Sequence, residues 1–145
     1  MGDKDTLGVV RARRFELVDG KGRARVILAE GTEESVFMRF LDTTGRLKVF
    51  VGMGDAGAPN ISLCHHDGVP SLTLVADKEG GVSIIGWSAY GNKSNQTFQV
   101  YLNPDGTTSH ARFFGRDGRA RAVFGMVNEN GGAGCFDSNG KQIRL

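Results

Sequence analysis

Short apolar runs alternate with clusters of glycine, aspartate and asparagine along the whole chain. In one such run, the apolar residues Leu72, Leu74 and Ala76 lie at every second position. Two hydroxyl residues, Ser71 and Thr73, lie at the intervening positions. This alternation is the pattern of a strand with one buried face. Turn residues return about every 10–13 positions, and no stretch shows the period of an amphipathic helix. The pattern predicts an all-β protein of about twelve short strands.

The turn clusters repeat with a period of 23 residues. LVDGKGR at 17–23 is followed by FLDTTGR at 40–46 and, near the end of the chain, by CFDSNGK at 135–141. The glycine of this motif recurs at Gly22, Gly45, Gly68, Gly91, Gly118 and Gly140. Four extra residues, Asn92–Asn95, account for the one longer step. Six units of one domain follow, near residues 9–31, 32–57, 58–80, 81–106, 107–131 and 132–145.

Each unit is predicted to be a β-hairpin, because aspartate bonds its own backbone in a turn and glycine supplies the positive φ. Several strands are apolar on both faces, as at 26–28, 49–51 and 84–85, so both faces need cover. Either the hairpins close within one chain into a barrel, prism or trefoil, or a second and third chain cover them. A trefoil would show a 46-residue period, which is absent. The single-hairpin period favours a spiral or prism, and we expect an interleaved homotrimer.

Composition places the chain among soluble folded domains. Its 145 residues suffice for one domain with a modest core, and glycine is enriched at 22 residues. No apolar run approaches the roughly 20 residues of a membrane helix, and no secretory leader opens the sequence. We therefore expect a cytoplasmic protein without a membrane partner.

The net charge of +2 does not indicate a polyanionic partner. Arginines recur two positions apart, as Arg11 and Arg13, Arg23 and Arg25, and Arg119 and Arg121. Such a pair can grip phosphates from one strand face, or it can pair across strands with an acid such as Glu16. No aromatic stacking platform is interleaved with these arginines, so we do not expect nucleic-acid binding.

The turn motif, an apolar residue followed by Asp-x-x-Gly-Arg, stands at Asp19–Arg23 and Asp42–Arg46. It resembles the YD-repeat units of bacterial surface and toxin-shell proteins, over about a third of each unit. The resemblance implies a bacterial hairpin-repeat fold and implies no activity. In this chain no tyrosine precedes Asp19, Asp42 or Asp137.

The densest group of metal-ligand residues is Cys64-His65-His66-Asp67. Neighbouring strand residues point to opposite faces, so His65 and His66 would not share a metal in one chain. Three copies of one histidine could meet on a three-fold axis. The alternative is that the two histidines fill the first two positions of a turn. Cys64 could act as a nucleophile with His66, or it could be a small buried residue. No orienting carboxylate is apparent, so we expect no catalytic site and no cofactor.

The fourth unit replaces its acidic turn with aromatic residues. Trp87, Tyr90, Asn92 and Asn95 form a candidate ligand site, because exposed aromatics beside asparagine are typical of sugar-binding and protein-binding loops. The alternative is that Trp87 fills an end of the core. We expect a non-enzymatic, self-associating structural or interaction module. The other hypotheses are a carbohydrate or small-ligand module at this loop, and a metal-dependent protein at His65 or His66.

Overall fold

The computed structural model describes residues 10–31, 35–53, 57–90, 93–127 and 130–143. Within them lie twelve strands and almost no helix, and no helix is long and apolar enough to cross a membrane. The strands are β1 (Arg14–Val18), β2 (Ala24–Glu30), β3 (Val36–Leu41), β4 (Leu47–Met53), β5 (Pro59–Cys64), β6 (Pro70–Ala76), β7 (Val82–Tyr90), β8 (Lys93–Leu102), β9 (Thr108–Phe114), β10 (Ala120–Val127), β11 (Asn130–Phe136) and β12 (Gln142–Ile143).

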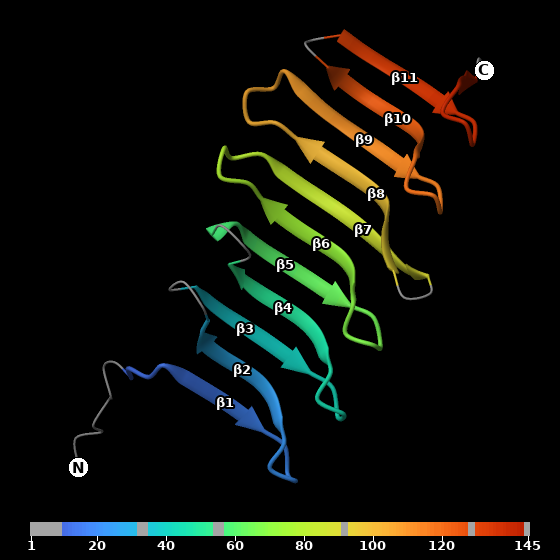
Figure 1. Cartoon of the computed structure of the whole chain (residues 1–145). Helices are drawn as coiled ribbons and strands as arrows, with labels where there is room; N and C mark the ends of the chain where they lie inside the picture. Colours follow the sequence, from blue (N-terminus) through green and yellow to red (C-terminus); the bar gives the residue numbers. More distant parts are fainter. Residues whose placement is uncertain (1–9, 32–34, 54–56, 91–92, 128–129, 144–145) are drawn as a thin grey trace, which may run out of the picture.

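All twelve strands form one sheet whose spatial order equals the chain order, and every neighbouring pair is antiparallel (Figure 1). The predictions of an all-β fold, of about twelve strands and of hairpin connections are confirmed. Closure into a barrel, prism or trefoil within one chain is wrong for the described residues, because β1 and β12 are the two open edges. Each strand pairs with the next one along the chain, and this leaves β12 at the far end of the sheet from β1.

The turns at one end of the strands share one hydrogen-bond pattern. The Asp19 amide donates to the Arg23 carbonyl over 2.9 Å, and the Gly22 amide donates to the Asp19 carbonyl over 2.8 Å. The same two bonds recur in the turns that begin at Asp42, His65, Gly115 and Asp137. In these five turns the glycine has a φ between 75° and 88°, which favours glycine over other residues. His65 therefore stands where Asp19 stands, as the turn interpretation of the two histidines predicts.

The aspartate side chains hold these turns. Oδ1 of Asp19 accepts hydrogen bonds from the amides of Lys21 (2.9 Å) and Arg23 (3.1 Å), and Oδ2 accepts one from Arg23 Nε (2.9 Å). The Arg23 side chain, as the largest cause, lowers the pKa of the Asp19 carboxyl to about 2. At Asp42 the Thr44 hydroxyl is the largest of several hydrogen bonds that hold the carboxyl pKa far below its usual value. Both carboxylates are therefore ionised acceptors at neutral pH.

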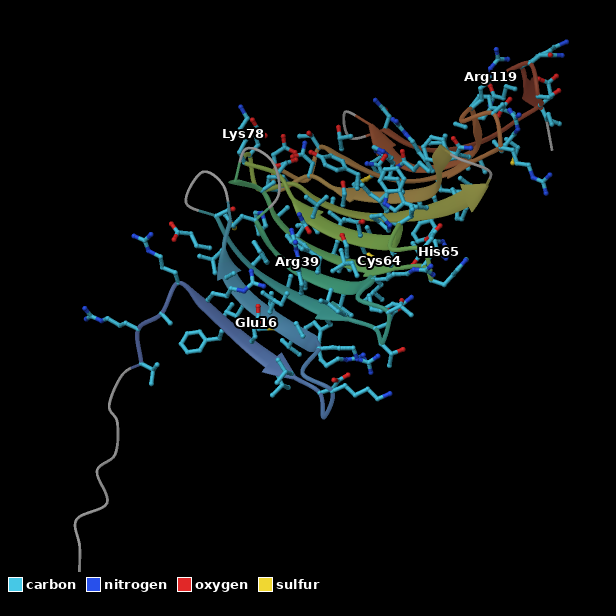
Figure 2. All side chains as sticks on the ribbon, turned by 60° about the horizontal axis from the view of Figure 1, so that its bottom comes forward. Glu16, Arg39, Cys64, His65, Lys78 and Arg119 are labelled. Atoms are coloured by element: carbon cyan, nitrogen blue, oxygen red, sulfur yellow. The ribbon has the colours of Figure 1, made fainter. Side chains whose placement is uncertain are left out.

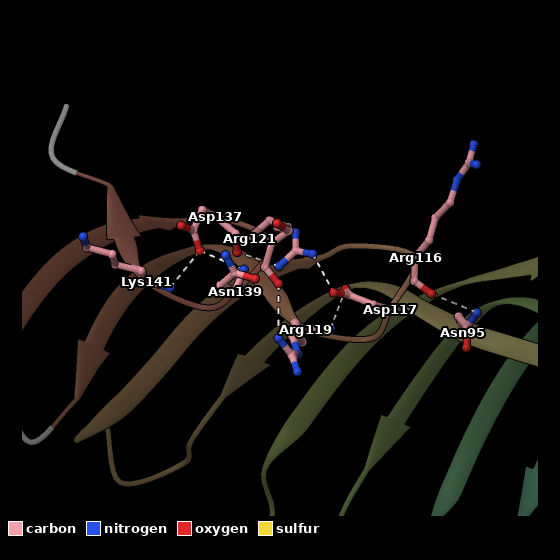
Figure 3. Close-up of polar contacts among 9 residues, drawn as sticks. Asn95, Arg116, Asp117, Arg119, Arg121, Asp137, Asn139 and Lys141 are labelled. Atoms are coloured by element: carbon pink, nitrogen blue, oxygen red, sulfur yellow. Dashed lines mark hydrogen bonds and ion pairs between the residues drawn. The ribbon is translucent and has the colours of Figure 1, made fainter.

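Arginine side chains connect three of these turns to the turn of the following hairpin. Nη1 of Arg23 donates to the Thr43 carbonyl over 3.0 Å, and Nη1 of Arg46 donates to the His66 carbonyl over 3.2 Å. Figure 3 shows the same arrangement near the C-terminus, where Arg119 donates to the Ser138 carbonyl over 3.2 Å. These bonds add side-chain contacts between neighbouring hairpins to the backbone ladder.

The first turn offers a matched pair of glycines. Gly22 has a φ of 75°, whereas Gly20 in the same turn does not have a positive φ of this kind. An added Cβ would meet open space at either glycine. We expect Gly22→Ala to lower the free energy of unfolding by about 1–2 kcal/mol through backbone strain alone, and Gly20→Ala to change it little. Denaturant titrations of both variants at one protein concentration measure this, and equal losses would contradict it.

The sheet is a single layer without a core of its own. Ala29 is the one buried hydrophobic residue among those described, and no large side chain there is fully buried. Figure 2 shows side chains standing on both sides of a bowed sheet with no second layer over either side. A folded domain of this size normally buries most of its apolar side chains, whereas the described residues of this chain leave most of theirs partly or largely exposed.

Candidate interaction face

The strand register divides the side chains between two faces, because residues directly paired across neighbouring strands point to the same side. One row of paired residues runs through eleven strands and is apolar at every position. Its members are Phe15, Leu28, Met38, Val51, Ile61, Leu74, Ile84, Val100, Ala111, Phe124 and Ala133. We call it the central row, and we call the face that carries it the apolar face.

Two further rows flank the central row on the apolar face, two residues away along each strand. The turn row, nearer the turns that begin at Asp19 and Asp42, consists of Leu17, Val26, Phe40, Val49, Leu63, Leu72, Gly86, Phe98, Phe113, Ala122 and Cys135. The loop row, on the other side, includes Met53, Pro59, Ala76, Val82, Leu102, Ser109, Met126 and Gly131. Each strand from β4 to β11 thus presents three residues to this face, and almost all of them are apolar.

The apolar face is uncovered in the described chain. Eighteen large hydrophobic side chains are at least 37% exposed, and sixteen of them lie on this face, from Phe15 in β1 to Ile143 in β12. At about 150–200 Å² per side chain, they expose on the order of 1,000 Å². The largest apolar patch of a typical monomer covers about 300–600 Å². The apolar face thus exposes more apolar area than the largest apolar patch of a typical monomer.

A hollow of about 480 Å³ opens on this face, between the central row and the loop row. Its lining side chains include Val51, Met53, Pro59, Ile61, Leu74 and Val82. The apolar face is therefore contoured, and a matching apolar surface could interlock with it.

The opposite face, which we call the mixed face, carries apolar residues among polar ones. Ile27, Phe50 and Ile85 lie on it, which confirms that their strands are apolar on both faces. The Arg39 guanidinium lies 4.2 Å from the centre of the Phe37 ring and covers part of it. Ile27, Phe50 and Ile85 are themselves half-buried, so the mixed face exposes less apolar surface than the apolar face.

Trp87 lies on the mixed face, near the start of the aromatic segment of the fourth unit. It is half-buried, and its indole N–H donates to Thr73 Oγ1 over 3.2 Å. The Thr73 hydroxyl lies 3.3 Å from the Ser62 hydroxyl, and Ser62 is buried. The tryptophan is thus fixed within the sheet by a side chain fourteen residues earlier in the chain.

The other residues of the candidate ligand site are less fully described. The Asn95 amide donates to the Arg116 carbonyl over 3.5 Å (Figure 3), on the strand next to that of Trp87. Asn92 lies outside the described residues, as does the side chain of Tyr90. Ligand binding at Trp87, Tyr90, Asn92 and Asn95 stays a prediction.

The residues 64–66 occupy the end of β5 and its turn. His65 is half-buried with no described hydrogen-bond partner for Nε2, and His66 is exposed. The described part of the chain contains no group of three or more histidine, cysteine, aspartate or glutamate residues placed to hold a metal. Burial raises the pKa of the Cys64 thiol, and the nearby Lys48 only partly opposes this. Cys64 is therefore a protonated thiol at neutral pH, and metal binding at His65 or His66 stays a prediction.

His110 is a residue that the sequence did not single out. Neither of its ring nitrogens has a described partner, and its ring lies 5.6 Å from that of Tyr101. Burial, followed by the charge of Arg112, lowers the pKa of His110. No sequence pattern marked it, because its surroundings depend on the strand register, which pairs it with Gly125 on one side and with Tyr101 on the other.

Comparison of the sequence with protein-family models gives no match, and comparison with curated proteins gives none either. The structure itself is therefore the source of functional inference. The apolar face extends over all twelve strands, whereas the other candidate residues lie in small groups on the mixed face and in one turn.

Proposed function

We propose that this chain is a non-enzymatic, self-associating structural or interaction module whose partner is the same chain. The observation that supports it is the apolar face, with sixteen large hydrophobic side chains exposed on one side of a single-layer sheet. Its exposed apolar area, on the order of 1,000 Å² per chain, exceeds the roughly 800 Å² per partner of a standard stable interface. Burial against copies of the same face gives the chain the core that the single sheet lacks.

Three copies form a prism in this proposal, each contributing six hairpins to one side. Packed sheets lie about 10 Å apart, so each sheet lies about 5 Å from the middle of the core. A triangular prism whose sides lie about 5 Å from its axis has sides about 17 Å long, which is about five residues of strand. Five residues hold three positions of one parity, and the apolar face has three rows. The central row then points at the three-fold axis.

Three sheets cover the flanking rows better than two would. The twelve strands stack over about 50 Å, whereas each strand is only about 17 Å wide across the three rows. In a two-sheet sandwich, the turn row and the loop row would lie along two open sides about 50 Å long. In a prism, each of these sides meets a neighbouring sheet, so both flanking rows are buried. The mixed face then points outward, where it can meet other partners.

Light scattering on a sizing column, over a hundredfold range of protein concentration, tests the proposal. The expected result is a mass of three times 15.6 kDa that persists on dilution. A folded protein with the mass of one chain would overturn self-association. A stable mass of two chains would overturn the prism and leave a two-sheet sandwich.

A further inference from the structure

The two long sides of the sheet differ in charge. One side, the turn edge, holds the described connections 19–23, 42–46, 65–69, 115–119 and 137–141, with six basic and five acidic residues. The described residues that connect the other strand ends are 31, 35, 57–58, 77–81 and 103–107, with three acidic residues and one lysine. We call this side the loop edge. Over the described residues, the turn edge therefore carries a net charge of +1 (six minus five) and the loop-edge connections carry −2 (one minus three).

Described residues contribute to this difference on both sides. Glu30, at the end of β2, adds a further exposed acid to the loop edge, and the Glu79 side chain there is 66% exposed. Lys21 is an exposed base on the turn edge. Arg11 and Arg13, which precede β1 at the loop edge, reduce the acidic excess but leave its sign unchanged.

A three-fold rotation keeps the direction of the strands around the axis. Each corner of a prism therefore joins the turn edge of one copy to the loop edge of the next, and never joins two like edges. The charges of the two edges are opposite, which favours this contact over one between like edges.

The apolar surfaces beside these edges are also complementary. The hollow of about 480 Å³ lies toward the loop edge, with Met53 and Pro59 in its lining. The turn row offers Phe40 and Leu63, which are 38% and 43% exposed, at strands near the hollow's level. A side chain of one surface can therefore fill the depression of the other.

We infer that the turn edge of one copy, with Phe40 and Leu63, packs head-to-tail on the loop edge of a second copy, over the hollow lined by Met53 and Pro59. The inference rests on the proposed three-fold assembly and names the surfaces that meet in it. Such a contact joins two different surfaces and closes after three copies, so it limits the assembly to a trimer.

Zero-length carbodiimide cross-linking of the unmodified protein tests the contact. Links from Lys21 on the turn edge to Glu30 on the loop edge, which lie at nearly the same level of the strand stack, cannot form within one chain. The strands between the edges span about 20 Å, and the reagent adds no spacer. We expect these links to form. When isotope-labelled and unlabelled chains are refolded together, some of the links should join a labelled chain to an unlabelled one. A trimer that gives no turn-to-loop links, or only turn-to-turn links, would overturn the inference. A monomeric mass would instead overturn the proposed function.

A charge-reversal pair gives a second measurement. Glu30→Lys places a base on the loop edge, whereas Glu16→Lys makes the same change in charge on the mixed face, away from both edges. We expect Glu30→Lys to raise the dissociation constant of the trimer about tenfold at low salt, an effect that shrinks at high salt. Glu16→Lys should leave it within about twofold of the unmodified protein. Equal effects of the two variants would overturn the inference.

Discussion

We expect the Ile84→Lys variant to have the mass of a single chain under conditions in which the Ile85→Lys variant keeps the mass of the trimer. The two isoleucines are neighbours in β7, and both are half-buried in the single sheet. Ile84 belongs to the central row, beside Leu74 and Val100, and Ile85 faces the other way, beside Thr73 and Gln99. In the prism, three copies of a lysine at position 84 would meet near the axis. Burying each charge costs several kcal/mol, so the association constant should fall at least about a thousandfold.

Light scattering and sedimentation of the two variants make this measurement. Since subunits that lack their own core often unfold when they separate, the milder pair Ile84→Ala and Ile85→Ala is a second test. At equal protein concentration, the first should lower the thermal midpoint more than the second, because only Ile84 loses contacts with the other copies. If both lysine variants stay trimeric with unchanged affinity, the apolar face is not the interface.

The second large effect is expected at Gly125, in the middle of β10. An added Cβ there would lie 2.6 Å from the His110 Cα and closer still to the Ser109 carbonyl oxygen. Both obstacles are backbone atoms of β9, so the strand itself would have to move. The φ of 148° also disfavours any other L-residue at this position. We expect Gly125→Ala to lower the free energy of unfolding by about 2–4 kcal/mol.

The directly paired residue provides the control. Gly132 lies opposite Gly125 on β11, and an added Cβ there meets nothing within 4 Å. Gly132→Ala should change stability by less than about 0.5 kcal/mol. Denaturant midpoints must be compared at equal protein concentration, because the stability of an oligomer depends on concentration. Equal losses at the two glycines would show that the close approach of β9 does not govern the effect.

Local features of the fold could be predicted from the sequence because each depends on residues close together in the chain. Asp19 and Gly22 build a turn three residues apart, and the same signals recur at Asp42 and Asp137. The period of 23 residues also placed His65 in the position of an aspartate, where the structure has it.

The apolar face itself could not be located from the sequence. The strands with apolar residues on both sides indicated that cover is needed, but not which side needs it more. Register shifts at the turn ends of hairpins, such as that between Leu17 and Val18, decide which residues align. Each shift changes the parity of the residues beyond it. The contact of Trp87 with Thr73 depends on the same alignment.

In the described chain, each strand bonds only to the strands before and after it along the chain. Strand pairing therefore joins only neighbours along the chain. One hairpin could be added or removed without changing how the strands of the other hairpins pair. Each hairpin adds two strand spacings, about 10 Å, to the length of the stack. The number of hairpins in the chain thus sets the length of the sheet, whereas its width along the strands does not depend on that number.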